Sequence, residues 1–114
     1  MDYFYRNVIS HVISAITELE DAECSCISLT LNEVDRDEFQ REFRDELDEH
    51  LPENHQIIGC NRFKCLLRVN ELYYIIAYSL YYDDNCEDYD EVNVSMMIKK
   101  YNNDIDAFNW YNSI

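Results

Sequence analysis

The stretch LYYIIAYSLYY, residues 72–82, carries apolar or aromatic side chains at nearly all of its odd and even positions. Successive side chains of a β-strand point to opposite faces of the sheet, so this strand presents apolar groups to both faces. A strand of this kind lies in the interior of a sheet and is covered, at least partly, on both sides. Residues 72–82 therefore predict a central strand around which the rest of the chain is arranged.

Short apolar runs at residues 56–60, 64–69 and 92–99 predict the neighbouring strands. Asn61 to Lys64 closes the first hairpin. Asn70-Glu71 closes the second, although Glu is a poor residue for the turns that two-residue loops prefer. Since the chain has a single glycine, asparagine is the expected residue for a positive φ. These runs predict an antiparallel meander.

Two segments before the meander also show clear periodicity. Apolar residues at helical spacing predict an N-terminal helix over about residues 3–20. Residues 24–31 alternate and predict a further strand. Its two faces are Ile27, Leu29 and Leu31 on one side, and Cys24, Cys26, Ser28 and Thr30 on the other.

A second helix is predicted from about Asp35 to His50, because Pro52 pushes Leu51 out of the helical region. Its buried stripe consists of Phe39, Phe43 and Leu47, and His50 falls on the same apolar side.

A short helix over residues 103–111 is expected to dock Ile105, Phe108 and Tyr111 onto the sheet. A chain of 114 residues has room for one core. We therefore expect a single domain, residues 1–114, of the α+β class: an antiparallel sheet of four or five strands with an N-terminal helix, an acidic second helix and a short C-terminal helix.

The negative charge of the chain is concentrated in two segments. Residues 33–53 hold ten acids and three arginines, a net of −7, and residues 83–91 hold six acids and no base, a net of −6. Together they account for −13 of the total of −15. A general solubility coat would be spread more evenly.

Each segment provides candidate binding residues. A rotation of about 100° per residue places six acids on the outward face of the second helix, with Arg41 among them. These acids are Asp37, Glu38, Glu42, Asp45, Asp48 and Glu49. The acids of the second segment are Asp83, Asp84, Glu87, Asp88, Asp90 and Glu91, and the tyrosines in or beside it are Tyr81, Tyr82 and Tyr89. Tyrosines of this kind are suited to anchor a protein contact, although most buried tyrosines only pack in a core.

Metal and catalytic sites are less favoured by the sequence. Counted from Asp84, the loop places Cys86 and Tyr89 where an EF-hand needs a ligand and a glycine, so a calcium loop is not expected. Some residues are of the types that bind zinc: Cys24-x-Cys26, Cys60, Cys65, His50 and His55. Their spacings are unusual for a zinc site, so cysteines packed in the core are the favoured interpretation. With Gly59 as the only glycine, a phosphate-binding loop is excluded. We expect no metal, no cofactor and no catalysis.

The charge pattern indicates the kind of partner. A negatively charged surface repels the phosphate backbone of DNA or RNA, so direct nucleic-acid binding is not expected. Carboxylates spaced about 6 Å apart on a helix or about 6.6 Å apart on an extended segment resemble successive phosphates. A basic protein that binds DNA or RNA is therefore the expected partner. The competing interpretation is a solvated face that only keeps the protein in solution.

In size, acidity, clustered carboxylates and aromatics, the chain resembles the small phage and mobile-element proteins that mimic DNA, such as anti-CRISPR and anti-restriction proteins. The resemblance covers the charged segments and implies non-catalytic inhibition of a host nucleic-acid enzyme. An immunity or antitoxin protein that neutralises a basic nuclease toxin is the alternative.

The segment Met1 to Glu20 has neither the basic region nor the apolar run of a signal peptide, and no run is long enough to span a membrane. Five cysteines in such a chain predict reduced thiols and a cytoplasmic location in the host cell. A homodimer is left open.

Overall fold

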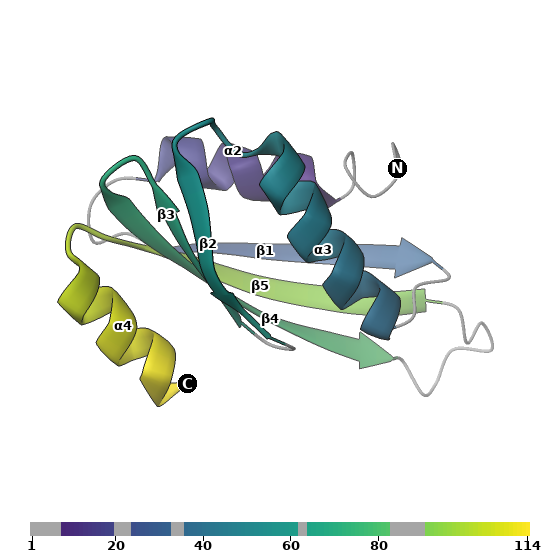
Figure 1. Ribbon diagram of the computed structural model, residues 1–114. Helices are drawn as coiled ribbons and strands as arrows, with labels where there is room; N and C mark the ends of the chain where they lie inside the picture. Colours follow the sequence, from purple (N-terminus) through teal and green to yellow (C-terminus); the bar gives the residue numbers. More distant parts are fainter. Residues whose placement is uncertain (1–7, 20–23, 33–35, 62–63, 83–90) are drawn as a thin grey trace.

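The computed structural model describes residues 8–19, 24–32, 36–61, 64–82 and 91–114 (Figure 1). This part of the chain forms a five-stranded antiparallel sheet with helices on both faces, which confirms the α+β prediction. The elements in chain order are α2 (Ser10–Glu18), β1 (Cys24–Asn32), α3 (Arg36–His50), β2 (His55–Cys60), β3 (Lys64–Val69), β4 (Leu72–Tyr82), β5 (Glu91–Tyr101) and α4 (Asp104–Ser113).

The strands follow the order β1-β5-β4-β3-β2. Strands β2 to β5 form the predicted meander, and β4 lies in the middle of the sheet. Strand β1 pairs with β5 along its whole length, from Cys24 opposite Lys99 to Asn32 opposite Glu91. The first strand of the chain therefore lies next to the last one, which leaves β1 and β2 as the two edges.

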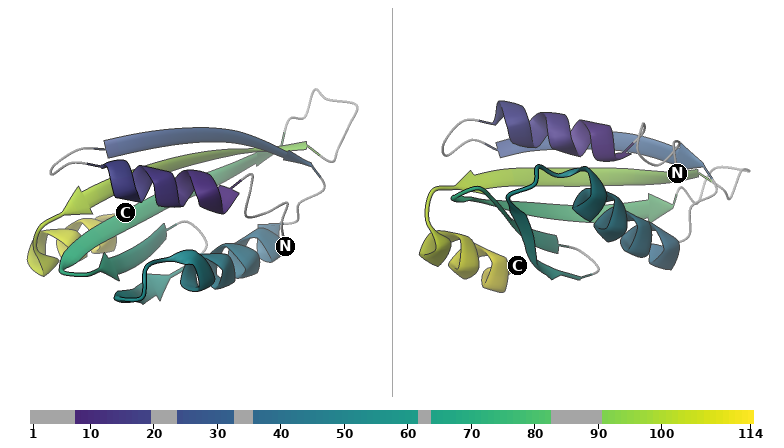
Figure 2. Two further views of the ribbon diagram at one scale, coloured as in Figure 1. Left: turned by 90° about the horizontal axis from the view of Figure 1, so that it is seen from above. Right: turned by 45° about the horizontal axis from the view of Figure 1, so that its top comes forward.

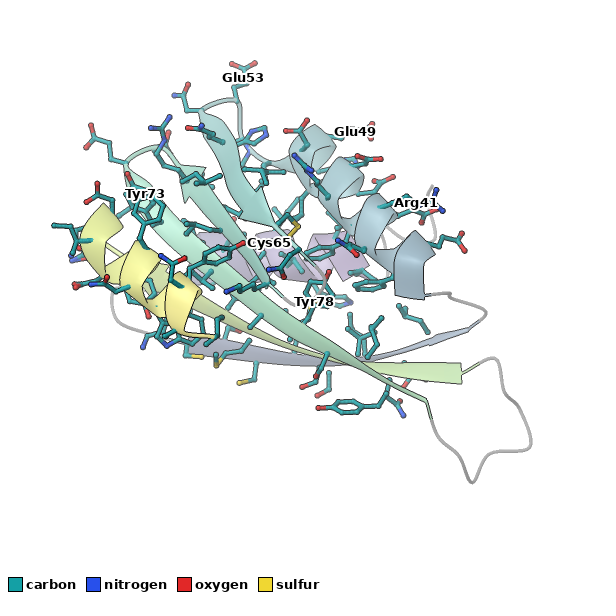
Figure 3. All side chains as sticks on the ribbon, turned by 60° about the horizontal axis from the view of Figure 1, so that its bottom comes forward. Arg41, Glu49, Glu53, Cys65, Tyr73 and Tyr78 are labelled. Carbon is teal, nitrogen blue, oxygen red and sulfur yellow. A yellow bond between two sulfur atoms is a disulfide. The ribbon has the colours of Figure 1, made fainter. Side chains whose placement is uncertain are left out.

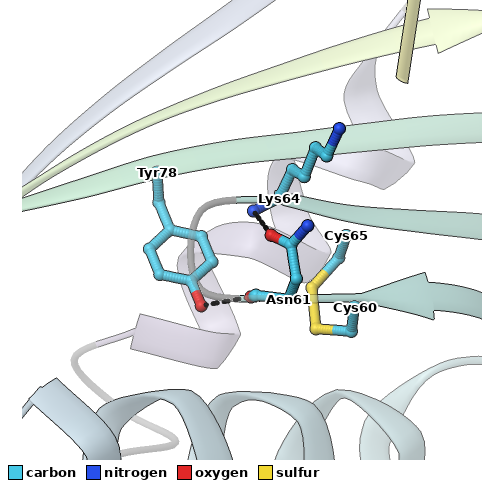
Figure 4. Close-up of a disulfide and its surroundings, with 5 residues drawn as sticks. All are labelled: Cys60, Asn61, Lys64, Cys65 and Tyr78. Carbon is cyan, nitrogen blue, oxygen red and sulfur yellow. Dashed lines mark hydrogen bonds between the residues drawn. A yellow bond between two sulfur atoms is a disulfide. The ribbon is translucent and has the colours of Figure 1, made fainter. Parts of the chain in front are cut away.

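Local turn chemistry explains the two hairpins. Asn70 has a φ of 58° in the β3–β4 turn, which confirms asparagine at a positive φ. In the β2–β3 connection, the side-chain oxygen of Asn61 accepts a hydrogen bond from the backbone N–H of Lys64 at 3.1 Å (Figure 4). The Tyr78 hydroxyl donates to the Asn61 carbonyl at 3.2 Å.

A disulfide joins Cys60 to Cys65 across the β2–β3 hairpin (Figure 4). The two residues are directly paired in the register of the strands, which brings their sulfur atoms together. The prediction of reduced thiols is therefore wrong for this pair. That prediction rests on composition and context, whereas the turn predicted at Asn61 to Lys64 already places these two cysteines on either side of a hairpin.

The main core lies between the sheet and helices α2 and α3 (Figure 2). Phe39, Phe43 and Leu47 are fully buried, as the stripe on the second helix predicted. The rings of Phe39 and Phe43 stack at 5.6 Å, and each also contacts the ring of Tyr78 on β4. Burial raises the pKa of Tyr78 to about 12, so this hydroxyl stays protonated at neutral pH.

Helix α4 covers part of the opposite face, where Ala107 packs with Leu66 and Ile75 and with the aromatic rings of Trp110 and Tyr111. The predicted contact residues are only partly right. Tyr111 faces the sheet and the Phe108 ring lies 6.3 Å from the ring of Tyr73 on β4, whereas Ile105 is 68% exposed. Residues 107, 108, 110 and 111 form the contacting side, where small Ala107 lets the helix approach closely.

Gly59 on β2 also permits that approach, since a Cβ there would lie 3.0 Å from the Tyr111 hydroxyl. The Lys64 ammonium donates to the carbonyls of Tyr111 and Ile114, and so holds the last turn of α4. The far part of this face stays uncovered, with Ala77 and Ser79 half-buried and Tyr81 exposed. Strand β4 is thus fully covered on one face and partly on the other.

Candidate anionic interface

Helix α3 packs on the sheet through its buried phenylalanines, and Arg41 and Glu49 point away from the sheet (Figure 3). Asp45, Asp48 and Glu49 are exposed, as predicted, while Glu38 and Glu42 are half-buried. Asp37 belongs to the first turn of α3, and the placement of its side chain lies outside what the structure describes. The helix holds seven acids and three arginines, a net of −4, along about 22 Å.

Three glutamates follow one another at four-residue spacing along α3: Glu38, Glu42 and Glu46. Side chains at this spacing are neighbours on a helix, and like charges there repel. The pKa of Glu42 is raised above its ordinary value, first by burial and then by the charges of Glu38 and Glu46, against the opposing charge of Arg41. The line of glutamates therefore concentrates negative potential along one side of the helix.

Two histidines lie beside carboxylates at the carboxyl end of α3. The Nε2 of His55 lies 2.9 Å from Asp48 Oδ1, and the Nδ1 contacts the carbonyl of Pro52. Both partners only accept hydrogen bonds, so both ring nitrogens donate only in the protonated imidazolium. The pKa of His55 is accordingly raised, mainly by the hydrogen bond to Asp48.

His50 does not pack in the core as predicted. It is exposed, and its Nε2 lies 3.1 Å from Glu46 Oε2. His50 is the last residue of α3, and its exposed side chain contacts Glu46 one turn earlier on the same helix. Glu46 and Asp48 thus each have a histidine neighbour, and Asp45 and Glu49 are exposed.

The acidic segment 83–91 lies almost wholly outside the described residues. The candidates Asp83, Asp84, Glu87, Asp88, Tyr89 and Asp90 belong to the part of the chain that the structure does not describe. Its flanks are described at the level of the backbone: Tyr82 ends β4 opposite Val92, and Glu91 begins β5 opposite Asn32. Helix α3 begins at Arg36, four residues after Asn32, and its first turn lies near this end of the sheet in Figure 1. Both acidic segments thus start from the same end of the sheet.

Tyr81 does not join the acidic face of α3. It belongs to the set of β4 side chains on the sheet face opposite α3, where it is 57% exposed and accepts a hydrogen bond from Ser79 at 3.0 Å. The alternation of a strand sends Tyr78 inward and Tyr81 outward. Tyr81 and the acids of α3 therefore cannot contact a small partner surface together.

The cysteines that suggested zinc are separated in the fold. Cys24 and Cys26 are exposed on β1, contrary to the expectation of packed thiols, while Cys60 and Cys65 form the disulfide. The exposure follows from the position of β1 at an edge, with its second face uncovered. Burial and the neighbouring Cys26 raise the pKa of the Cys24 thiol.

Within the described residues, one group places three potential cation ligands together, with one ligand atom from each of Glu46, Glu49 and His50 within 4.8 Å of one another. Sequence reasoning missed this group because it assigned His50 to the core. Acid clusters on exposed helices are common without a metal, and the absence of a metal remains a prediction that elemental analysis can test.

Comparison with known proteins finds no family model, no curated protein and no solved structure that matches this chain. In the part of the chain that the structure covers, none of the helices combines the length and the apolar character needed to cross a bilayer.

Proposed function

We propose that this chain is a non-catalytic acidic inhibitor that occupies the nucleic-acid site of a basic protein. The observation that carries the proposal is the outward face of α3, where Asp45 and Glu49 are exposed beside a line of three glutamates. Helical spacing holds these carboxylates about 6 Å apart. A groove lined with Lys and Arg that grips phosphates at similar intervals can bind such an array.

The fold supports this use of α3 because the helix is anchored through buried aromatic rings. Phe39 and Phe43 are fully buried and contact Tyr78, so the helix presents its charges from a fixed position. A rigid array loses little conformational entropy on binding, which favours affinity. The proposed partner is a nuclease or a CRISPR effector of a host defence or repair system, met in the cytoplasm.

The segment 83–91 extends the same proposal. Its flanks at Tyr82 and Glu91 leave the sheet near the end at which α3 begins, and we propose that its six acids and those of α3 meet the same partner. Long-range attraction by both groups accelerates association with a basic surface and weakens as salt rises.

The decisive experiment captures partners from host lysate on the immobilised protein and repeats the capture with rising salt and with added DNA. We expect a basic nucleic-acid-binding protein that is released by salt and displaced by DNA. Capture of an acidic or neutral partner that resists salt would refute the proposal.

A pair of matched variants then locates the interface. Asp45→Lys with Glu49→Lys reverses two exposed charges of α3, whereas Glu18→Lys with Glu71→Lys reverses two exposed charges elsewhere. Both double variants change the formal net charge from −15 to −11. We expect the α3 variant to slow association with the captured partner by about tenfold or more at low salt, and the control to slow it much less. Equal effects would indicate that only net charge matters.

The acids of the second segment have their own variant, Asp84→Lys with Asp88→Lys, which carries the same change of charge. Slower association than with the Glu18 and Glu71 control would assign this segment to the interface. An unchanged rate would leave α3 as the binding element.

A further inference from the structure

The two edges of the sheet differ in how they are protected against pairing with another chain. Strand β2 is six residues long and its register shifts between Ile57 and Gly59. Strand β1 is nine residues long, pairs with β5 without a shift, and contains no charged residue and no proline. Short length, bulges, charges and prolines are the usual means of blocking an edge, and β1 has none of them.

Within the described residues, no other strand pairs with the outer edge of β1. Viewed from above in Figure 2, β1 forms the border of the sheet, and α2 lies over the sheet inside that border. Among the described residues, no backbone hydrogen bond from a turn or loop reaches this strand. An unpaired row of N–H and C=O groups with this regularity is a template for one more strand.

The distribution of charge favours a second copy of the same chain as that strand. Two molecules of net charge −15 repel each other, and the repulsion is weakest where they approach through neutral surfaces. Strand β1 is uncharged, and α2 beside it carries one formal charge, on Glu18. The charged helix α3 lies toward the other edge of the sheet, beside β2 (Figure 2).

We propose that β1 pairs antiparallel with β1 of a second copy around a two-fold axis at Ser28. This register is the one that pairs all nine residues from Cys24 to Asn32. It joins the two sheets into one continuous sheet, and it uses the same patch on both chains, as a closed dimer requires.

The side chains of β1 agree with this register. Ile27 of each copy lies opposite Leu29 of the other on the core side, where both are only half-buried in the single chain. On the other face, Ser28 meets Ser28 and Cys26 meets Thr30, which are small groups. Cross-strand apolar pairs of this kind stabilise a sheet, and no like charges meet within the nine paired residues.

The dimer has a consequence for the molecular surface. A two-fold axis perpendicular to the sheet leaves both copies of α3 on the same face, with the two β1 strands between them. The inference does not depend on the proposed function, but a dimer would present two anionic helices to a long basic surface.

The test measures the molar mass of the wild-type protein by sedimentation equilibrium from about 5 to about 500 µM, at about 0.15 M salt and again at higher salt to screen repulsion. We expect the average molar mass to rise toward that of a dimer as the protein concentration increases. A monomer under all these conditions would overturn the proposal.

A matched pair of variants identifies the edge. Ser28→Lys places two like charges at the proposed axis, and Gln56→Lys makes the same change at an exposed position on β2. Both variants lower the net negative charge, so dissociation cannot result from general repulsion. We expect Ser28→Lys to weaken the dimer at least tenfold, and Gln56→Lys to leave it intact. A dimer that survives Ser28→Lys would place the interface elsewhere.

A second measurement covers the case in which Ser28→Lys fails to fold. In a background of Cys24→Ser, Cys26→Ser and Cys86→Ser, Ser28→Cys is compared with Gln56→Cys under mild oxidation. Directly opposed residues of antiparallel strands lie within disulfide range. We expect a covalent dimer from Ser28→Cys alone. Equal cross-linking of both variants, or none, would contradict pairing through β1.

Discussion

At the scale of single residues, three aromatic side chains stabilise the main core. The three aromatic rings of Phe39, Phe43 and Tyr78 occupy the space between α3 and β4, with centroids 5.2 to 5.6 Å apart. Each phenylalanine therefore contributes both buried apolar area and ring contacts. This cluster is the reason that a strongly acidic helix remains attached to the sheet.

Phe43→Ala is expected to lower the free energy of unfolding by about 3–5 kcal/mol, because it removes a fully buried ring and leaves a cavity. Urea unfolding followed by circular dichroism measures the loss. Phe108→Ala is the control, since Phe108 is 37% exposed, and it should cost clearly less. Equal losses would mean that the α3 cluster is not the principal core.

The pair of His55 and Asp48 makes stability depend on pH. The folded state raises the pKa of His55 above its unfolded value near 6.5, so the protonated ring stabilises the fold. This contribution is fully present below the unfolded pKa and is lost as the pH rises through the folded pKa. Asp48 is 70% exposed, so the effect is expected to stay below about 1 kcal/mol.

Asp48→Asn should lower the pKa of His55, as measured by NMR titration, and should flatten the decline of unfolding free energy between pH 6 and pH 8. Asp45→Asn, which removes an exposed carboxylate of the same helix, is the control. A His55 pKa that is the same in wild type and in Asp48→Asn would show that Asp48 does not hold the proton.

At the scale of the element, α3 combines strong burial with unfavourable charge. Its line of Glu38, Glu42 and Glu46 repels itself along one side, and burial adds to the cost at Glu42. A carboxyl whose folded pKa is raised destabilises the fold when it is ionised. The penalty is therefore present at neutral pH and is relieved as the pH falls through the folded pKa of Glu42.

Glu42→Gln should raise the free energy of unfolding at pH 7 and low salt by several tenths of a kcal/mol, because two repulsive four-residue pairs are removed at about 0.2–0.5 kcal/mol each. Thermal unfolding at low and high salt measures the gain, which should shrink as salt screens the charges. Glu53→Gln, an exposed site beyond the helix, is the control. If Glu42→Gln is destabilising, the carboxylate makes a favourable contact instead.

For the molecule as a whole, a formal charge of −15 on 114 residues opposes compaction. Adding NaCl from about 0.02 M to about 0.5 M should therefore raise Tm by a few degrees, since the Debye length falls below the spacing of most exposed charges. The double variant Asp45→Lys with Glu49→Lys should show a smaller rise. A Tm that does not respond to salt would mean that the charges lie too far apart to interact.

Local sequence patterns predicted most of the elements. The strand at residues 72–82, the helix that ends at His50 and the buried stripe of Phe39, Phe43 and Leu47 are all confirmed. These features depend on periodicity and on breakers such as Pro52, which act over a few residues. The exposed acids Asp45, Asp48 and Glu49 were predictable for the same reason.

Contacts between different elements were less predictable. The ion pair of His55 with Asp48 and the docking side of α4 each depend on how one element meets another. The predicted turn at Asn61 to Lys64 already places Cys60 opposite Cys65, so only the oxidation of this pair was missed. The contact side of α4 was partly wrong, because the helix has weak amphipathicity and small Ala107 sets its approach. His50 was assigned to the core because a helical wheel does not show where the covering layer ends.

By itself, the amino-acid sequence determined the α+β class, the central place of residues 72–82 and the concentration of charge in two segments, because patterning and composition are local properties. The tertiary structure alone decided that β1 lies beside β5 with an uncharged outer edge to which no described strand pairs, that Tyr81 lies on the face opposite α3, and that both acidic segments start from one end of the sheet. The physical reason is that strand order and the covering of each face follow from which apolar surfaces pack together across the whole chain, and no short stretch of residues contains that information.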